Sequence, residues 1–386
     1  MANPDNSNNR KKIFNVIDYG VVQYDPNYAS QNVSAMNAAI SDAAAIGGGT
    51  IVIPNGDIFL NDRVGGDYTS AGLAFEGTGT NARLVFQGGM TNGLYINANG
   101  VKVQGLRFLV QASPNINQGS VLYVRNANAL PNGIILRDLD FAGTSDARPG
   151  NFLAAVNPQE SLIANVSIDS NSGEPFGTQS NGIYVLGDRI CTDFSVRDCK
   201  VLRVNTAFAV RGGDSTNGQQ TVEGISFTDN VTFGVQTGLY MTAGYQAPGH
   251  SWKGGHINAE LYCVNLNSWA QFKISDALLY LNQSNPNAQG FILATNCTQI
   301  QAHNNHLIHV AETGPSAGTQ CFGVAFAGST SYSLAAFNDM AGAPPGSACV
   351  YNANNSTTNR SFGNSKTGGG AVVVGNITEL GGEANI

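Results

Sequence analysis

A short strand pattern decides the fold, and its clearest copies are Gly93-Leu94-Tyr95-Ile96, Gly182-Ile183-Tyr184-Val185 and Gly238-Leu239-Tyr240-Met241. Each copy follows a small or polar residue and alternates apolar with other side chains, which is typical of a half-buried strand. The further copies are Val121-Leu122-Tyr123-Val124, Asn151-Phe152-Leu153, Ala207-Phe208-Ala209-Val210, Gly290-Phe291-Ile292-Leu293, Gly323-Val324-Ala325-Phe326, Cys349-Val350-Tyr351 and Ala371-Val372-Val373. Apart from one double-length interval, which holds a degenerate copy near Val264, the period is roughly 23 to 32 residues. A period of this length that tolerates insertions is typical of a solenoid.

A second pattern recurs after each of these strands. It reads apolar-X-Asp/Asn/Gly, as in Leu136-Arg137-Asp138 and Val196-Arg197-Asp198. Asp, Asn and Gly tolerate a left-handed backbone, so we expect a tight turn between two strands of a coil. The acids at this position are then structural rather than catalytic, and they are Asp138, Asp198, Asp229 and Asp276.

The two patterns together predict an all-β chain. We expect a right-handed, single-stranded parallel β-helix with three strands in each coil. About 11–12 coils at a rise of roughly 4.8 Å would form a rod roughly 55 Å long. The expected organisation is a flexible leader over residues 1–12, an N-terminal cap over 13–60 and a β-helix body over 61–386.

The expected cap contains a helix over residues 31–46. An apolar stripe supports it, formed by Met36, Ala39, Ile40, Ala43 and Ile46. Asn32 or Ser34 is expected to cap its start, and Gly47-Gly48-Gly49 to end it before the strand Thr50-Ile51-Val52-Ile53. Such a helix would cover the open first coil, whose core and strand edges are otherwise exposed.

The cap sequence carries a resemblance to a known family. Phe14-Asn15-Val16-Ile17-Asp18-Tyr19-Gly20, the helix, Gly47-Gly48-Gly49-Thr50 to Pro54, and Gly56 resemble the opening of the pectate-lyase-like β-helix superfamily. The resemblance implies the parallel β-helix fold. It also implies a reaction among those of polysaccharide lyases, glycoside hydrolases, uronan epimerases and phage tailspikes, without selecting one.

Composition excludes several functions. A net charge of −7 without a marked Lys/Arg cluster argues against nucleic acid as a partner. Residues 1–12 lack the apolar segment of a secretory signal, and no apolar run is long enough to span a membrane. We therefore expect cytoplasmic synthesis, with release by lysis or non-classical export. The six cysteines lie in apolar patterns and are expected to be reduced core residues. We expect no metal or other cofactor, and we interpret His303, His306 and His309 as turn or surface residues.

One outward face of the rod is expected to bind the substrate. If Leu94 and Ile96 point inward, the alternation directs rows of tyrosine and arginine outward. Tyrosine offers sugar rings a flat face and a hydroxyl, and arginine binds carboxylate or sulfate groups. The predicted substrate-binding residues on this face are Tyr95, Tyr123, Arg125, Tyr184, Arg211 and Tyr240. An oligomer interface is enriched in the same residue types and remains an alternative interpretation.

The candidate catalytic residues are Asp188, Asp214 and Glu174. Glycoside hydrolysis needs two carboxyl groups, and Asp188 and Asp214 follow the outward strand at similar offsets on adjacent coils. The segment after Tyr240 is expected to be a loop that adds Tyr245, His250 and Lys253 to substrate binding. A lyase would instead use Arg211, Tyr240, His250 and Lys253.

The sequence therefore predicts a carbohydrate-active enzyme that cleaves a polysaccharide, with hydrolysis favoured over elimination. A glycan-binding or receptor-binding rod and an intramolecular glycosyl transferase remain open as alternatives. We also expect a homotrimer, because closed cyclic symmetry lets a rod bury one long face against two copies.

Overall fold

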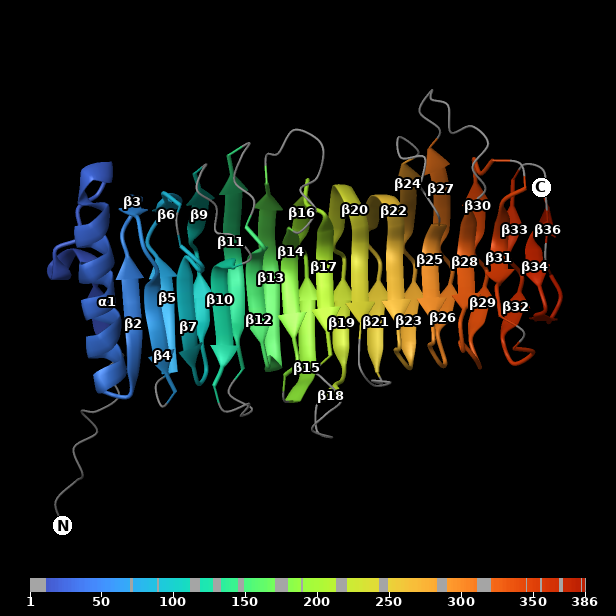
Figure 1. The fold of residues 1–386 in the computed structure, drawn as a ribbon, viewed down its shortest axis with the longest axis horizontal. Helices are drawn as coiled ribbons and strands as arrows, with labels where there is room; N and C mark the ends of the chain where they lie inside the picture. The colour runs from blue at the N-terminus through green and yellow to red at the C-terminus, as the bar shows by residue number, and fades with distance from the viewer. Residues whose placement is uncertain are drawn as a thin grey trace, which may run out of the picture.

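Strands of successive coils pair in parallel throughout the computed structural model, so the chain forms one continuous stack of coils (Figure 1). The structure describes residues 12–69, 72–88, 90–111, 119–127, 133–144, 149–170, 180–188, 190–212, 221–242, 249–282, 290–310, 321–344, 346–354, 356–367, 371–382 and 384–385. Each coil contributes a strand to each of three faces. The predicted right-handed parallel β-helix with an N-terminal helix is confirmed.

Face 1 consists of the predicted alternating strands, paired coil by coil along the rod. Within the described ranges it comprises β4 (Val64–Tyr68), β7 (Leu94–Ala98), β10 (Ser120–Asn126), β12 (Asn151–Val156), β14 (Asn181–Leu186), β17 (Thr206–Arg211), the second half of β20 (Val231–Thr242), the second half of β22 (His256–Asn267), β25 (Gly290–Thr295), β28 (Phe322–Ala327), β31 (Ala348–Asn352) and β34 (Val373–Gly375). The degenerate copy expected near Val264 is the second half of β22, where Val264 pairs with Leu239.

Faces 2 and 3 complete each coil. Face 2 comprises β1 (Ile13–Asn15), β2 (Gly48–Ile53), β5 (Gly72–Gly77), β8 (Lys102–Gln104), the first parts of β11 (Ile135–Gly143) and β13 (Gln159–Asp169), β15 (Ile190–Arg197), β18 (Thr221–Val222), β19 (Ile225–Thr228), β21 (His250–Lys253), β23 (Phe272–Ser275), β26 (Gln301–His303), β29 (Leu334–Ala336), β32 (Arg360–Phe362) and β35 (Thr378–Glu379). Face 3 comprises β3 (Gly56–Leu60), β6 (Ala82–Phe86), β9 (Arg107–Val110), the second parts of β11 and β13, β16 (Lys200–Leu202), the first halves of β20 and β22, β24 (Leu278–Asn282), β27 (His306–Val310), β30 (Asp339–Ala341), β33 (Ser365–Lys366) and β36 (Ala384–Asn385).

The helix of the N-terminal cap begins two residues earlier than the sequence predicted, at Ala29 instead of residue 31. Two 3-10 turns, η2 (Val16–Tyr19) and η3 (Pro26–Tyr28), lead into α1 (Ala29–Ala45), which packs against β2, β3 and β4 (Figure 1). Neither Asn32 nor Ser34 caps the helix, because both lie inside it. The Asn32 side chain is instead fully buried, accepting from the backbone N–H of Val22 and donating to the backbone oxygens of Val22 and Phe59.

The end of α1 also differs in one detail. Ile46 was expected in the buried stripe, but it is the residue at which the helix ends, and it is 43% exposed. The following Gly47 has a φ of 83°, which only glycine adopts without strain, so the expected glycine stop is confirmed.

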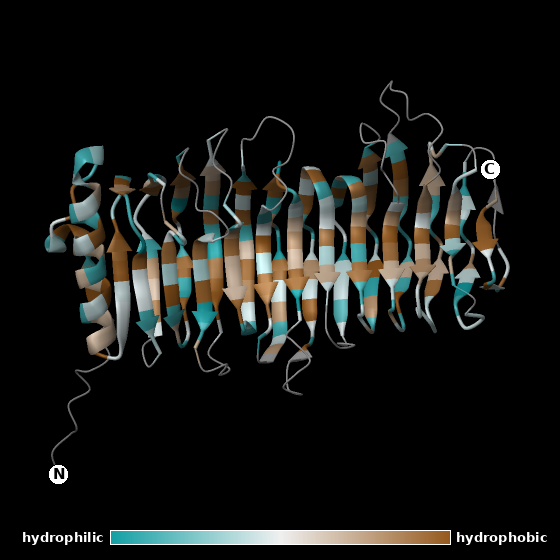
Figure 2. Cartoon of the chain, in the orientation of Figure 1, coloured by the Kyte–Doolittle hydropathy of each residue, from teal (hydrophilic) through white to brown (hydrophobic). Residues whose placement is uncertain are grey.

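The apolar core of the rod extends from Val16 to Val350. Hydrophobic residues alternate with hydrophilic ones along many of the strands (Figure 2). Both tryptophans, Trp252 and Trp269, and many phenylalanines are completely buried among the aliphatic side chains. All six cysteines are buried and unpaired with one another, as the apolar patterns predicted. Burial raises the pKa of the Cys199 thiol to about 12 and of the Cys297 thiol to about 11, so these thiols stay protonated near neutral pH.

The corner between faces 2 and 3 holds the predicted turn residues, which we name the turn ladder. The backbone is left-handed at Gly105, Asp138, Asn165, Asp198, Asp229, Asp276 and Asn304, with φ values between 51° and 65°. On the outside of the corner, neighbouring coils are joined by side chains. The Asn165 amide donates to Asp138 and the Asn304 amide donates to Asp276, each at 2.7 Å. The hydrogen bond from Asn304 is the main cause that lowers the pKa of Asp276.

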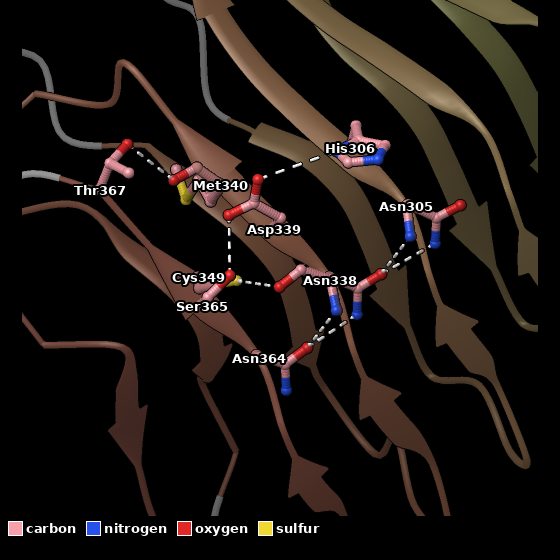
Figure 3. Close-up of polar contacts among 9 residues, drawn as sticks. All are labelled: Asn305, His306, Asn338, Asp339, Met340, Cys349, Asn364, Ser365 and Thr367. Carbon is pink, nitrogen blue, oxygen red and sulfur yellow. Dashed lines mark hydrogen bonds and ion pairs between the residues drawn. The ribbon is translucent and has the colours of Figure 1, made fainter. Parts of the chain in front are cut away.

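A buried row of asparagines lies just inside the same corner near the C-terminal end (Figure 3). The Asn305 amide donates to the side-chain oxygen of Asn338 at 2.9 Å, and the Asn338 amide donates to that of Asn364 at 2.9 Å. All three side chains are at most 1% exposed. The row therefore satisfies the backbone and side-chain polar groups that three consecutive turns would otherwise leave unbonded.

Candidate functional site

The outward side chains of face 1 stack in two rows along the rod. Strand register places Tyr95, Tyr123, Ala154, Tyr184, Ala209 and Tyr240 in one row, and Asp67, Asn97, Arg125, Val156, Leu186, Arg211 and Thr242 in the other. Leu94 and Ile96 are completely buried, so the alternation predicted which side chains point inward. We call the surface from Asp67 to Tyr240 the face 1 site.

The first part of the face 1 site is a stack of aromatic rings. The rings of Tyr95 and Tyr123 lie parallel, with centroids 4.9 Å apart, and the guanidinium of Arg63 lies 5.1 Å from the centroid of Tyr95. Because Arg63 and Tyr123 come from the coils on either side, both faces of the Tyr95 ring are covered. A ligand would therefore meet Tyr95 through its edge and hydroxyl, whereas the sequence predicted an open flat face.

Asp67 anchors this stack from the preceding coil. Its Oδ1 accepts from the Tyr95 hydroxyl at 3.1 Å and from the Asn97 amide at 2.7 Å. Burial, ahead of the hydrogen bond to Asp67, raises the pKa of Tyr95, so this hydroxyl stays protonated and acts as a donor.

Asp188 lies at the other side of Tyr123. Its Oδ2 is 2.7 Å from Nη2 of Arg125, and Arg125 also hydrogen-bonds the Tyr123 side chain. The backbone N–H of Asp188 donates to the side-chain oxygen of Asn157 at 2.9 Å, which fixes the start of the turn after β14. Within the described part of the chain, Oδ1 of Asp188 is shielded from solvent and has no hydrogen-bond partner. The site thus holds one carboxylate that is oriented by Arg125 and partly buried.

The remaining predicted residues of this face, Tyr184, Arg211 and Tyr240, lie two, three and four coils beyond Tyr123. The Tyr184 side chain hydrogen-bonds Arg211 on the next coil; burial raises the pKa of Tyr184, and Arg211 partly opposes that rise. Tyr240 is 36% exposed. The small side chains of Ala154 and Ala209 separate Tyr123, Tyr184 and Tyr240, so these three rings occupy every second coil.

Two predicted binding residues lie elsewhere. His250 begins β21 on face 2 and is 2% exposed, with its ring packed edge-on against Trp269 at 4.6 Å between centroids. It belongs to the core because it alternates in phase with the inward Trp252, so the expectation of a loop residue that contacts substrate is wrong. Lys253 ends the same strand on face 2, away from Tyr240.

Three further candidates, Glu174, Asp214 and Tyr245, lie outside the described residues. The strands that precede the segments containing Asp188 and Asp214 are described, and β14 and β17 are adjacent and in register. Sequence reasoning missed Asp67 and Arg63. The spacing of the repeat could have revealed them, because Val64 lies one period before Leu94. The strand was overlooked because Val64-Gly65-Gly66 lacks the alternation of apolar residues.

The three histidines interpreted as turn or surface residues have different surroundings. β27 pairs with β30 and brings Asp339 Oδ2 to 3.8 Å from His306 Nδ1 (Figure 3). His303 is the last residue of β26 and is partly exposed. His309 is 4% exposed, so the expectation of a turn or surface position is wrong for this residue. Among the described residues, no three His, Cys, Asp or Glu side chains converge to hold a metal ion.

Comparison with known proteins identifies the fold. No protein-family model matches the sequence, and no curated protein sequence matches it. Solved structures do match, including the A-module of Azotobacter vinelandii mannuronan C-5 epimerase AlgE4, with a TM-score of 0.55, 15% identity, and coverage of 97% of this chain and 100% of that one. An exopolygalacturonase from Thermotoga maritima matches with a TM-score of 0.55, 12% identity, and coverage of 96% and 92%. PfbA, a surface adhesin of Streptococcus pneumoniae, matches with a TM-score of 0.63, 11% identity, and coverage of 94% and 91%.

At sequence identities of 11–15%, the similarity to these structures shows a shared fold only. The chain has the parallel β-helix fold that its cap sequence predicted. Proteins with this architecture include an epimerase, a polygalacturonase and an adhesin, so the fold alone does not select a reaction. None of the described helices is long and apolar enough to cross a membrane.

Proposed function

We propose that this protein is a carbohydrate-active enzyme that binds a polysaccharide along the face 1 site and cleaves it. One observation carries the proposal: the carboxylate of Asp188 is paired with Arg125, and its backbone is held by Asn157, on a face where tyrosine and arginine side chains recur along the rod. The row lies on paired strands rather than on loops, which gives a site the rigidity that catalysis requires.

We favour glycoside hydrolysis as the reaction. A carboxylate paired with a guanidinium is suited to act as base or nucleophile, so a second carboxyl group must donate the proton. Asp214 is our first candidate, because β14 and β17 are adjacent and neighbouring strands lie roughly 4.8 Å apart. That spacing is close to the separation of about 5 Å in retaining enzymes. Glu174 and the newly located Asp67 are the other candidates.

Elimination from a uronate is the second candidate reaction. The contact between Tyr184 and Arg211 is the observation behind it, because the guanidinium opposes part of the rise in the pKa of Tyr184 that burial causes, and a phenol at this position could exchange a proton with the substrate. Arg211 would also bind the substrate carboxylate. Of the lyase residues that the sequence suggested, Arg211 and Tyr240 remain, while His250 and Lys253 drop out.

A rod that binds glycans or a receptor without cleaving them is the third possibility, and the matching surface adhesin gives it a precedent in architecture. An intramolecular glycosyl transferase is a fourth. We also retain the homotrimer as a proposal, to be checked by light scattering. A mass near the 40.3 kDa of one chain at micromolar concentration would reject it.

The deciding experiment incubates the protein with a panel of capsular, plant and algal polysaccharides. New reducing ends without ultraviolet absorbance indicate hydrolysis, and absorbance of an unsaturated product indicates elimination. Cleavage that is lost in Asp188→Asn supports the site. Binding without any cleavage would reject the enzyme and select the non-catalytic rod.

A further inference from the structure

A hollow lies at the corner between faces 2 and 3, on the side of the rod away from the face 1 site. It has a volume of about 450 Å³ and spans four successive coils, from the turn after β5 to the middle of β13. Two of its lining residues, Gly79 and Gly105, have no side chain, and this leaves the space open. Its volume falls in the range of small-molecule sites.

The polar groups that line the hollow are of mixed type. Arg107, Asp140 and Ser167 are register partners on adjacent coils, so a guanidinium, a carboxylate and a hydroxyl follow one another along the rod. Asp138 and Asn165, members of the turn ladder, line the same hollow and are joined at 2.7 Å. The groups include both donors and acceptors within reach of one ligand.

The charges in and around the hollow are balanced and loosely held. Arg107 Nε lies 3.8 Å from Asp140 Oδ2, and both side chains are 48% exposed. Arg137 Nε lies at the same distance, 3.8 Å, from Asp138 Oδ2. A strong anion would meet the carboxylates and a cation would meet the guanidinium groups, so neither ion is favoured. The lining fits a neutral ligand that both donates and accepts hydrogen bonds.

Sugar hydroxyl groups have this property, since each donates one hydrogen bond and accepts others. We infer that the hollow is a second glycan-binding site, specific for neutral sugars and separate from the face 1 site. None of the described lining residues is aromatic, so a single sugar would bind weakly. Binding would become strong for a polymer that engages several rods or both sites at once. The inference does not depend on whether the protein cleaves glycans.

Affinity gel electrophoresis tests this inference. The probes are dextran, galactomannan and laminarin as neutral polymers, and alginate and polygalacturonate as anionic ones. Two variants disable the hollow: Ser167→Trp fills it, and the double variant Arg107→Ala/Asp140→Ala removes a charge pair without changing net charge. Lys200→Trp is the matched control, because Lys200 is the register partner of Ser167 on the next coil and lies beyond the lining. Arg125→Ala disables the face 1 site.

We expect at least one neutral polymer to retard the parental protein, Lys200→Trp and Arg125→Ala. The affinity should fall about tenfold or more in both hollow variants, since each loses more than one hydrogen bond of about 1 kcal/mol. Circular dichroism confirms that each variant is folded. The inference is overturned if no neutral polymer retards the protein, or if both hollow variants bind like the parent. Binding only to anionic polymers, strengthened by Asp140→Ala alone, would overturn it in favour of an anion site.

Discussion

Two groups of aspartates on this rod differ in what holds them. In the turn ladder, Asp198 and Asp229 have left-handed backbones, and the corner between faces 2 and 3 requires that conformation. In the face 1 site, Asp188 has an ordinary backbone, and its carboxylate is held by Arg125 at 2.7 Å. The required backbone conformation explains why aspartate occurs in the turn ladder. At Asp188, only the contacts of the side chain give a reason for aspartate. The same residue type thus supports structure at one corner of the coil and is available for chemistry at another.

The largest expected effect is on the rate. Asp188→Asn should lower kcat by about a hundredfold or more on the polymer identified in the panel, because positioned proton transfer contributes roughly 10²–10⁴. The free energy of unfolding should change by less than about 1 kcal/mol, since the ion pair with Arg125 is partly exposed and screened by solvent. Steady-state kinetics and urea denaturation measure the two effects.

Asp67→Asn is the matched variant for this test. It neutralises the other described carboxylate of the face 1 site while keeping its shape. A rate lost in Asp67→Asn and retained in Asp188→Asn would move the catalytic role to Asp67. Parental rates in both variants would exclude both acids, and the comparison between the two aspartate groups would then have no functional meaning.

The next largest effect is on stability alone, and it concerns the buried asparagine row at the corner between faces 2 and 3. Asn338→Leu should lower the free energy of unfolding by about 2–3 kcal/mol, because it removes the buried hydrogen bonds that the Asn338 side chain makes. These bonds join it to the backbone N–H and amide of Asn305, to the Ala302 oxygen and to the Asn364 side chain. Activity should not change. Asp339→Asn, at the exposed neighbouring position, should stay within about 0.5 kcal/mol. Equal stability of the two variants in urea denaturation would contradict a role for the buried row.

A smaller effect is expected for the turn ladder. Asp198→Ala should cost about 1 kcal/mol of unfolding free energy, because alanine tolerates the φ of 55° less well than aspartate. Asp198→Gly should be close to neutral, since glycine adopts this φ freely. Both variants should cleave at the parental rate. A rate loss in Asp198→Gly, measured beside its unfolding curve, would place this acid with the catalytic group.

The smallest effect concerns binding. Tyr240→Ala should raise KM about threefold to tenfold with kcat nearly unchanged, as expected if an aromatic contact worth roughly 0.5–1.5 kcal/mol is lost. Tyr351→Ala is the control, because Tyr351 lies on face 1 beyond the site and is similarly exposed, at 38% against 36%. If both variants raise KM equally, the substrate covers more of face 1 than the site defined here.

The strand repeat and the turn ladder could be predicted from the sequence because both are local. A strand needs alternation over a few residues, and a left-handed turn needs Asp, Asn or Gly at one position. Leu94 and Asp198 therefore revealed their roles without knowledge of any neighbour. The same reasoning failed for Ile46 and His250. Ile46 is exposed because the helix ends there, and His250 is buried because a strand begins there.

The contacts of the site were decided only by the tertiary structure. Arg125 reaches Asp188 across an intervening coil, and the Tyr95 ring is covered by Arg63 and Tyr123 from the coils on either side. Stacking brings such residues together at a spacing set by strand pairing, while loop insertions vary the number of residues between them. The sequence by itself determined the coil, its period and the side chains that point outward. Which of those side chains meet depends on the register between coils, because each contact joins residues that are distant in the chain.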